Sequence, residues 1–218
     1  MSSILNLLLP FALILPAIVF HEVAHGYAAL LLGDTTAKER GRLSLNPIKH
    51  IDPFGTVLLP LLLIAMFGFG FGYAKPVPVN PHRFTGDLRK GMFLTGIAGP
   101  AANLAMAAVG GVVVRVATAA GAQMGWLFDG ALLFVYLNLA LLFFNLIPLP
   151  PLDGSRVLPL FLSDRAMRAY GQWERYGFVI LFGVLWLAPR FLGFDPIDAY
   201  FSVTVRPLVT LLTGVSIG

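Results

Sequence analysis

Residues 1–32 read MSSILNLLLPFALILPAIVFHEVAHGYAALLL, and this stretch decides the fold. The apolar run from Ile4 to Leu32 predicts a helix about 43 Å long, at roughly 1.5 Å per residue. That length exceeds the hydrocarbon core of a bilayer, so we expect a membrane-spanning helix that tilts or protrudes. The run has no Lys or Arg near its start and continues into His21 and Glu22. We therefore expect it to be retained rather than cleaved as a signal peptide.

The rest of the chain is equally poor in charge. Of its 218 residues, 57% are hydrophobic and 12% are charged, about half the charge of a soluble domain. Segments 91–110 and 130–152 carry no charged residue at all. This composition excludes an ordinary soluble domain and a disordered chain, and it indicates a polytopic membrane protein. The absence of cysteine excludes disulfides, thiolate metal ligands and a thiol nucleophile.

Further apolar runs predict an all-α membrane protein with about five to six transmembrane helices. The runs cover Met92–Ala119, Ala131–Ile147, Tyr176–Pro189 and a weaker segment, Ala199–Val215. We expect one membrane-embedded domain over residues 1–218, with its core at 4–156 and its C-terminal helices at 176–217.

The distribution of cations predicts the topology. Loops 34–53, 74–90 and 155–175 carry four cations each, whereas loop 121–130 carries none. The positive-inside rule places the three basic loops in the cytoplasm, and it explains the net charge of +4 without a nucleic-acid partner. The first two loops share a side only if Val57–Tyr73 enters the membrane and returns. We expect a re-entrant or partly inserted segment there; the alternative is an ordinary span with one loop that violates the rule.

Two short segments flanking that stretch resemble each other. Arg42–Pro47 and Lys75–Pro81 both look extended and both end in Asn-Pro. Pro76 and Pro78 blunt one edge of the second segment, whereas Val77 and Val79 keep backbone donors for the other edge. The pattern predicts a small membrane-associated β element. Two unrelated Pro-bounded loops are the alternative.

A metal-binding motif lies inside the first apolar run. In His21-Glu22-Val23-Ala24-His25 the two histidines are four residues apart, so a helix places both imidazoles on one face. Glu22 is adjacent and within reach of a water on the same metal ion. Three ionisable groups inside an apolar span are costly without a function. The motif therefore predicts His21 and His25 as metal ligands, with Glu22 beside them.

A catalytic zinc ion needs a third protein ligand and an open position for water. Asp153 ends the apolar run of the third span, behind prolines that stop the helix and before Gly154, which permits a tight turn. By the charge argument, the first and third spans both run toward the cytoplasm. Asp153 would then lie near the two histidines on the cytoplasmic side, and we predict it as the third ligand of one Zn²⁺ per chain.

Three segments in this order resemble the site-2 protease family of intramembrane zinc metalloproteases: His21–His25, Gly96–Asn103 and Asn145–Gly154. The resemblance implies an intramembrane zinc endopeptidase that cuts a single-span membrane-protein segment in or near the bilayer. It also implies the ligand set His21, His25 and Asp153, with Glu22 as acid and base. Since no loop exceeds about 25 residues, it implies a compact member without a PDZ domain.

The resemblance further suggests that Asn145 lies near the scissile carbonyl as an oxyanion donor. The alternative for Asn145 is a helix-end cap, and Asn103 is equally compatible with a hydrogen-bonding core role and a catalytic one. We expect a multi-pass protein of the cell membrane whose partners are the lipid bilayer and a membrane-protein substrate. Two other functions stay open: a zinc or proton transporter, and a silent family member that binds membrane segments without cleaving them.

Overall fold

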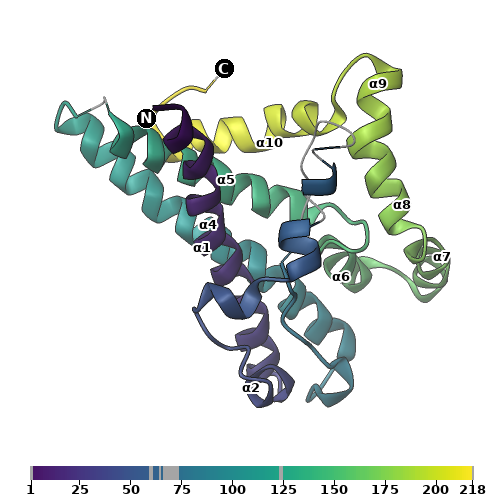
Figure 1. The fold of residues 1–218 in the computed structure, drawn as a ribbon. Helices are drawn as coiled ribbons and strands as arrows, with labels where there is room; N and C mark the ends of the chain where they lie inside the picture. Colours follow the sequence, from purple (N-terminus) through teal and green to yellow (C-terminus); the bar gives the residue numbers. More distant parts are fainter. Residues whose placement is uncertain (1, 59–60, 64, 66–73, 123–124, 218) are drawn as a thin grey trace.

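The computed structural model describes residues 2–58, 61–63, 65, 74–122 and 125–217, and every regular element in these ranges is a helix. Three helices are long and apolar enough to cross a membrane. They are α1 (Ser2–Leu31), α4 (Leu88–Ala119) and α5 (Trp126–Leu146). In Figure 1, α1 and α5 both start at the upper left and α4 ends there, so α4 is antiparallel to the other two.

Local sequence signals explain where the long helices begin and end. The carboxylate of Asp87 accepts a hydrogen bond from the Lys90 N–H at 2.8 Å and caps the start of α4. Past the end of α1, Gly33 takes a φ of +97°, a backbone conformation that favours glycine. The buried core between α4, α5 and α10 (Pro196–Thr213) consists of Ala107, Val135, Leu139, Val205 and Val209.

Shorter helices lie at the bottom and on the right of the molecule in Figure 1. Before α4 they are α2 (Thr36–Glu39), the π-helix η2 (Pro53–Leu58) and the 3-10 turns η1 (Pro47–His50) and η3 (Pro81–Arg83). After α5 they are α6 (Gly154–Val157), η4 (Leu158–Phe161), α7 (Asp164–Glu174), α8 (Gly177–Phe182), η5 (Gly183–Leu187) and α9 (Ala188–Leu192).

The number of candidate spans is smaller than the sequence suggested. In the ranges that the structure describes there are three, or four if α7 and the segment Gly177–Leu192, bent by 68°, form one broken span. We expected five to six. Helix α10 is not among the candidates; it carries Asp198 and Arg206, whose side chains pair at 2.6 Å. The re-entrant prediction for Val57–Tyr73 falls mostly outside the described residues.

The predicted β element is wrong for the described residues, because the backbone groups that a strand pair would use bind elsewhere. The Arg42 guanidinium donates to the Lys75 carbonyl at 2.6 Å. The Lys75 N–H donates to the His50 carbonyl at 2.9 Å, and the Val77 N–H donates to the Glu22 carboxylate at 2.7 Å. The two segments remain extended loops that lie close together.

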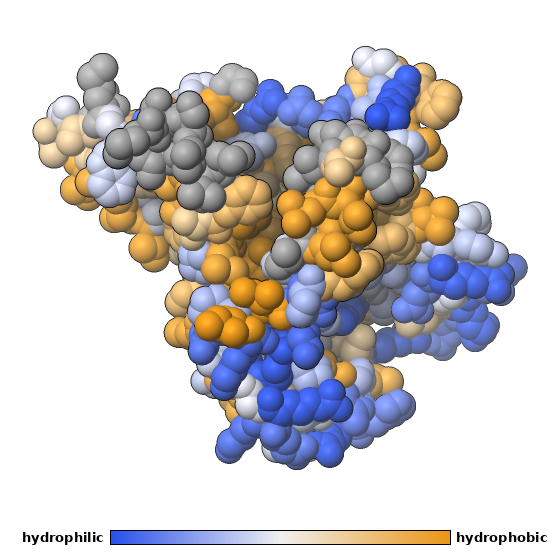
Figure 2. All heavy atoms as spheres, in the orientation of Figure 1, coloured by the Kyte–Doolittle hydropathy of each residue, from blue (hydrophilic) through white to orange (hydrophobic). Residues whose placement is uncertain are grey.

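The surface reflects the composition of the helices. Figure 2 shows hydrophilic residues gathered at the lower end, over α2, and at the right, over α7. Much of the surface between these regions is hydrophobic. Exposed apolar side chains on α1, α4 and α5 include Phe20, Leu31, Val112 and Trp126. Such a distribution suits helices whose outer faces contact lipid.

Candidate metal centre

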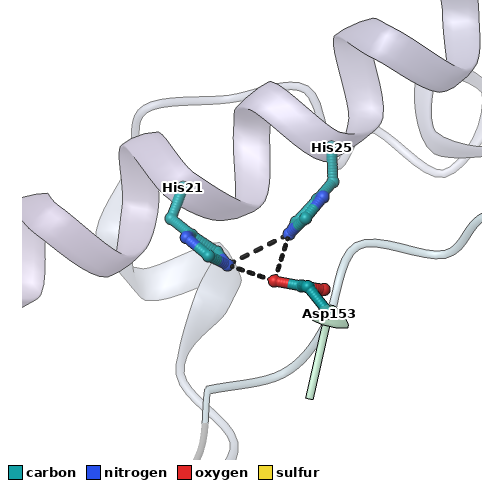
Figure 3. Close-up of side chains that lie close together, drawn as sticks. All are labelled: His21, His25 and Asp153. Carbon is teal, nitrogen blue, oxygen red and sulfur yellow. Dashed lines mark hydrogen bonds and ion pairs between the residues drawn. The ribbon is translucent and has the colours of Figure 1, made fainter. Parts of the chain in front are cut away.

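Three predicted ligands converge in the interior, from two distant parts of the chain (Figure 3). His21 and His25 project from one face of α1, and Asp153 immediately precedes α6. Both Nε2 atoms lie close to Asp153 Oδ2, at 3.0 Å for His21 and 3.1 Å for His25, and they are 3.0 Å from each other. All three residues are buried. Among the described residues this is the one group that could hold a metal ion.

The far side of each imidazole faces an oxygen. His21 Nδ1 lies 2.6 Å from Asn103 Oδ1, and His25 Nδ1 lies 2.6 Å from the Thr95 carbonyl. A neutral imidazole has one N–H, so these contacts place the hydrogen on Nδ1 and leave Nε2 with a lone pair. Backbone or side-chain oxygens on the far nitrogen are the usual partners of metal-ligating histidines.

The Asp153 carboxylate completes the set of ligand atoms. Its Oδ2 lies within 3.1 Å of both Nε2 atoms. The carboxylate and two lone pairs therefore point at one place. Ligand atoms of a tetrahedral zinc ion, with bonds of about 2.0–2.1 Å, lie about 3.3 Å apart. The observed spacing is close to that value, so these residues fit a zinc ion.

Gly99 has no side chain, and this leaves space for the imidazoles of His21 and His25. A Cβ built on Gly99 of α4 would lie 2.6 Å from His21 Nε2 and closer still to His25 Nε2. In protein structures, Cβ atoms do not come this close to another heavy atom. The backbone of α4 therefore passes directly beside the ligand nitrogens, and any larger side chain would occupy the space that they enclose.

Glu22 lies next to the ligands and is held by an extended segment. Its Oε2 accepts the Val77 N–H at 2.7 Å, which fixes one oxygen of this carboxylate. Further along the same segment, Asn80 donates its N–H to Asp34 Oδ2 at 2.6 Å. Residues 77–80 thus run beside the C-terminal half of α1.

Asp34 anchors the far end of that segment. Its side chain is fully buried and also accepts hydrogen bonds from the N–H and the hydroxyl of Thr36. Burial raises the pKa of Asp34, but the bonds from Thr36 and Asn80 outweigh burial and bring that pKa below its ordinary value. Asp34 is therefore ionised at neutral pH and holds residues 77–80 in place.

Asn145 and Asn103 occupy different environments. The Asn145 amide donates to the Leu141 carbonyl at 2.9 Å, one turn back in α5, and its role near the scissile bond stays a prediction. Asn103 is fully buried, and its Oδ1 lies 2.6 Å from Nδ1 of His21, which agrees with the hydrogen-bonding core role. A direct catalytic role for Asn103 stays a prediction.

Sequence reasoning missed several contributors to the site. The carbonyl of Thr95 and the N–H of Val77 act through the backbone, which leaves no signal in residue type. Asn138 is fully buried and bonds to Asn103 at 3.0 Å. The signal for it was present, since it is a polar residue in the middle of the uncharged stretch 130–152.

Known proteins resemble this chain along most of its length. The model of peptidase family M50 matches residues 106–187. A protein of Bacillus subtilis named "Putative zinc metalloprotease YwhC" is 40% identical over 218 residues, which cover 93% of this chain and 95% of the relative. No solved structure matches the chain.

Two relatives named "Putative zinc metalloprotease Rip2" are 32% identical to this chain. The one from Mycolicibacterium smegmatis aligns over 77% of this chain and 62% of its own length. The one from Mycobacterium tuberculosis aligns over 82% of this chain and 66% of its own length. The chain therefore spans less than two thirds of Rip2 but nearly all of YwhC. By this similarity the chain belongs to peptidase family M50, the site-2 protease family that its motifs predict.

Proposed function

We propose that this membrane protein is an intramembrane zinc endopeptidase that hydrolyses a peptide bond in or near the membrane segment of a single-span protein. One observation carries the proposal: His21, His25 and Asp153 direct three electron-pair donors at one buried point. Family membership supports the same chemistry.

Each residue of the site has its own role in the proposed reaction. Zinc, when bound, supplies a Lewis acid that activates water and polarises the substrate carbonyl. His21, His25 and Asp153 hold it, and Asn103 and the Thr95 carbonyl orient the imidazoles. Glu22 takes a proton from the attacking water and delivers it to the amine that leaves. The bond from the Val77 N–H holds one oxygen of the Glu22 carboxylate in place.

The position of the site in the chain supports its orientation toward the cytoplasm. The basic loops 34–53 and 155–175 follow the two segments that carry the ligands, and the positive-inside rule places such loops in the cytoplasm. We propose that the active site opens toward that side and that the surrounding helices contact the lipid bilayer. A substrate helix must unwind locally there, because carbonyls inside a helix are hydrogen-bonded and shielded.

The test is cleavage of a single-span membrane protein by the purified protein in liposomes, with zinc content measured on the same samples. We expect Glu22→Gln to keep zinc and lose cleavage, and Asp153→Ala to bind zinc more weakly and lose cleavage. Glu39→Gln is the matched control, because it neutralises an exposed carboxylate that pairs with Arg83 and contacts none of the predicted ligands. It should cleave normally.

Two outcomes would contradict the proposal. Metal transport that survives Glu22→Gln, with no cleavage by the wild type, would favour a transporter. Binding of membrane segments without cleavage, again unaffected by Glu22→Gln, would favour a silent family member. The single group of ligand-type side chains in the described part of the chain argues against a transport path with several sites.

A further inference from the structure

Two asparagines form a buried connection that starts at the metal centre and crosses three helices. Asn103 on α4 and Asn138 on α5 are both fully buried. Asn103 Oδ1 faces His21 Nδ1 on α1 at 2.6 Å, and Asn103 Nδ2 faces Asn138 Oδ1 at 3.0 Å. Buried amides are costly in an apolar interior unless their groups are paired, so each of these contacts must join a donor to an acceptor.

Two backbone carbonyls decide the direction of every bond in this connection. Asn138 Nδ2 donates to the Phe134 carbonyl at 2.9 Å, and Asn103 Nδ2 also donates to the Ala17 carbonyl at 3.3 Å. A carbonyl can only accept, so rotating either amide by half a turn would set oxygen against oxygen. Asn103 must therefore present its oxygen to His21, and His21 must carry its hydrogen on Nδ1.

We propose that Asn138 is a positioning residue for the metal centre: it locks the Asn103 amide, which in turn holds His21 in the tautomer whose Nε2 lone pair is free for zinc. The inference rests on the proposed function for the identity of the metal. It assigns to α5 a role at the ligands of α1, in addition to carrying the chain to Asp153.

The other histidine provides an internal reference. His25 Nδ1 faces the backbone carbonyl of Thr95, which cannot rotate. No side chain is needed to fix the tautomer of His25. Substitution of Asn138 should therefore change the environment of His21 and leave that of His25 as it is.

The experiment compares Asn138→Leu, which is close to isosteric but cannot pair with Asn103, with the wild type. Loss of an outer partner of a metal-ligating histidine typically weakens metal affinity 10- to 100-fold. We expect about a 10-fold rise in the zinc dissociation constant for Asn138→Leu and about a 100-fold rise for Asn103→Leu, which removes the contact itself. Leu139→Ala is the packing control, because Leu139 is the buried neighbour in α5 but lies outside the connection. It should lower thermal stability and keep zinc affinity within about twofold.

A spectroscopic measurement separates positioning from a loss of folding. In protein labelled with ¹⁵N-histidine, the Nδ1–H of His21 should exchange slowly with water in the wild type and faster in Asn138→Leu. The corresponding His25 signal should not change. Unchanged His21 exchange together with unchanged zinc affinity in Asn138→Leu would overturn the inference. If the wild type bound no zinc, the proposed function would fail, yet the exchange measurement on the metal-free protein would still test the role of Asn138.

Discussion

Replacing Gly99 by alanine should disable the metal centre. The added Cβ would lie 2.6 Å from His21 Nε2, whereas ordinary contact between such atoms requires about 3.5 Å. Helices α1 and α4 would have to separate by about 1 Å locally. Metal–ligand distances tolerate about 0.2 Å, so His21, His25 and Asp153 could not all reach one ion. We expect zinc affinity to fall by at least about 100-fold.

The assay is a zinc titration of the purified protein against a competing chelator, with thermal unfolding recorded in parallel. Gly130→Ala is the matched control, because a Cβ built on Gly130 of α5 would have no neighbour within 4 Å. That substitution should leave zinc affinity unchanged and stabilise α5 by up to about 1 kcal/mol. Wild-type zinc affinity and normal cleavage in Gly99→Ala would refute the close approach of α4 to the ligand nitrogens.

Three further predictions concern the periphery of the site and the metal itself. Asp34→Asn should destabilise the protein by about 2 kcal/mol at neutral pH, because it weakens the buried bonds from Thr36 and Asn80. Folding lowers the pKa of Asp34, so its contribution to the free energy of unfolding is complete above about pH 4 and declines as the pH falls through the lower folded value. The difference in stability between Asp34→Asn and the wild type should therefore become smaller in acid. Trp173 on α7 is 64% exposed, and no residue of this amphipathic helix is buried. In a variant that keeps Trp173 as its one tryptophan, brominated lipids should therefore quench the fluorescence. Quenching by aqueous iodide alone would place α7 away from the membrane. Chelation should abolish cleavage, and about one equivalent of zinc should restore it; cleavage that persists in metal-free protein would contradict a metal mechanism.

The convergence of His21, His25 and Asp153 was predictable because their placement follows local rules. The spacing of His21 and His25 places them on one helical face whatever surrounds the helix. Asp153 followed from topology, since the direction of the first and third spans brings both helix ends to the same side. The structure brings these three together as expected.

The contacts that support the site could not be read from local patterns. Asn138 reaches His21 only through Asn103, and this depends on how three helices pack. The β element failed for a related reason: the Val77 N–H, counted as a free strand donor, binds the Glu22 carboxylate instead. Hydrogen-bond donors of extended segments are satisfied by whichever acceptor the tertiary fold supplies.

In the part of the chain that the structure describes, the number of spans was overestimated because two apolar runs do not qualify as spans on their own. Helix α10 carries the charged pair formed by Asp198 and Arg206, and it is not among the candidate spans. The segment Gly177–Leu192 is helical throughout but includes the π-helical stretch η5. It reaches the length of a span only in combination with α7, to which it is bent by 68°.

The central claim is that His21, His25 and Asp153 bind one zinc ion, and X-ray absorption at the zinc edge tests it most directly. The purified wild type should contain about one zinc per chain, with two imidazole nitrogens and carboxylate oxygen at about 2.0–2.1 Å. In Asp153→Ala the carboxylate contribution should disappear, and in His25→Ala one imidazole should be lost. A spectrum of the wild type with no imidazole scattering, or one that is unchanged in both variants, would contradict the account.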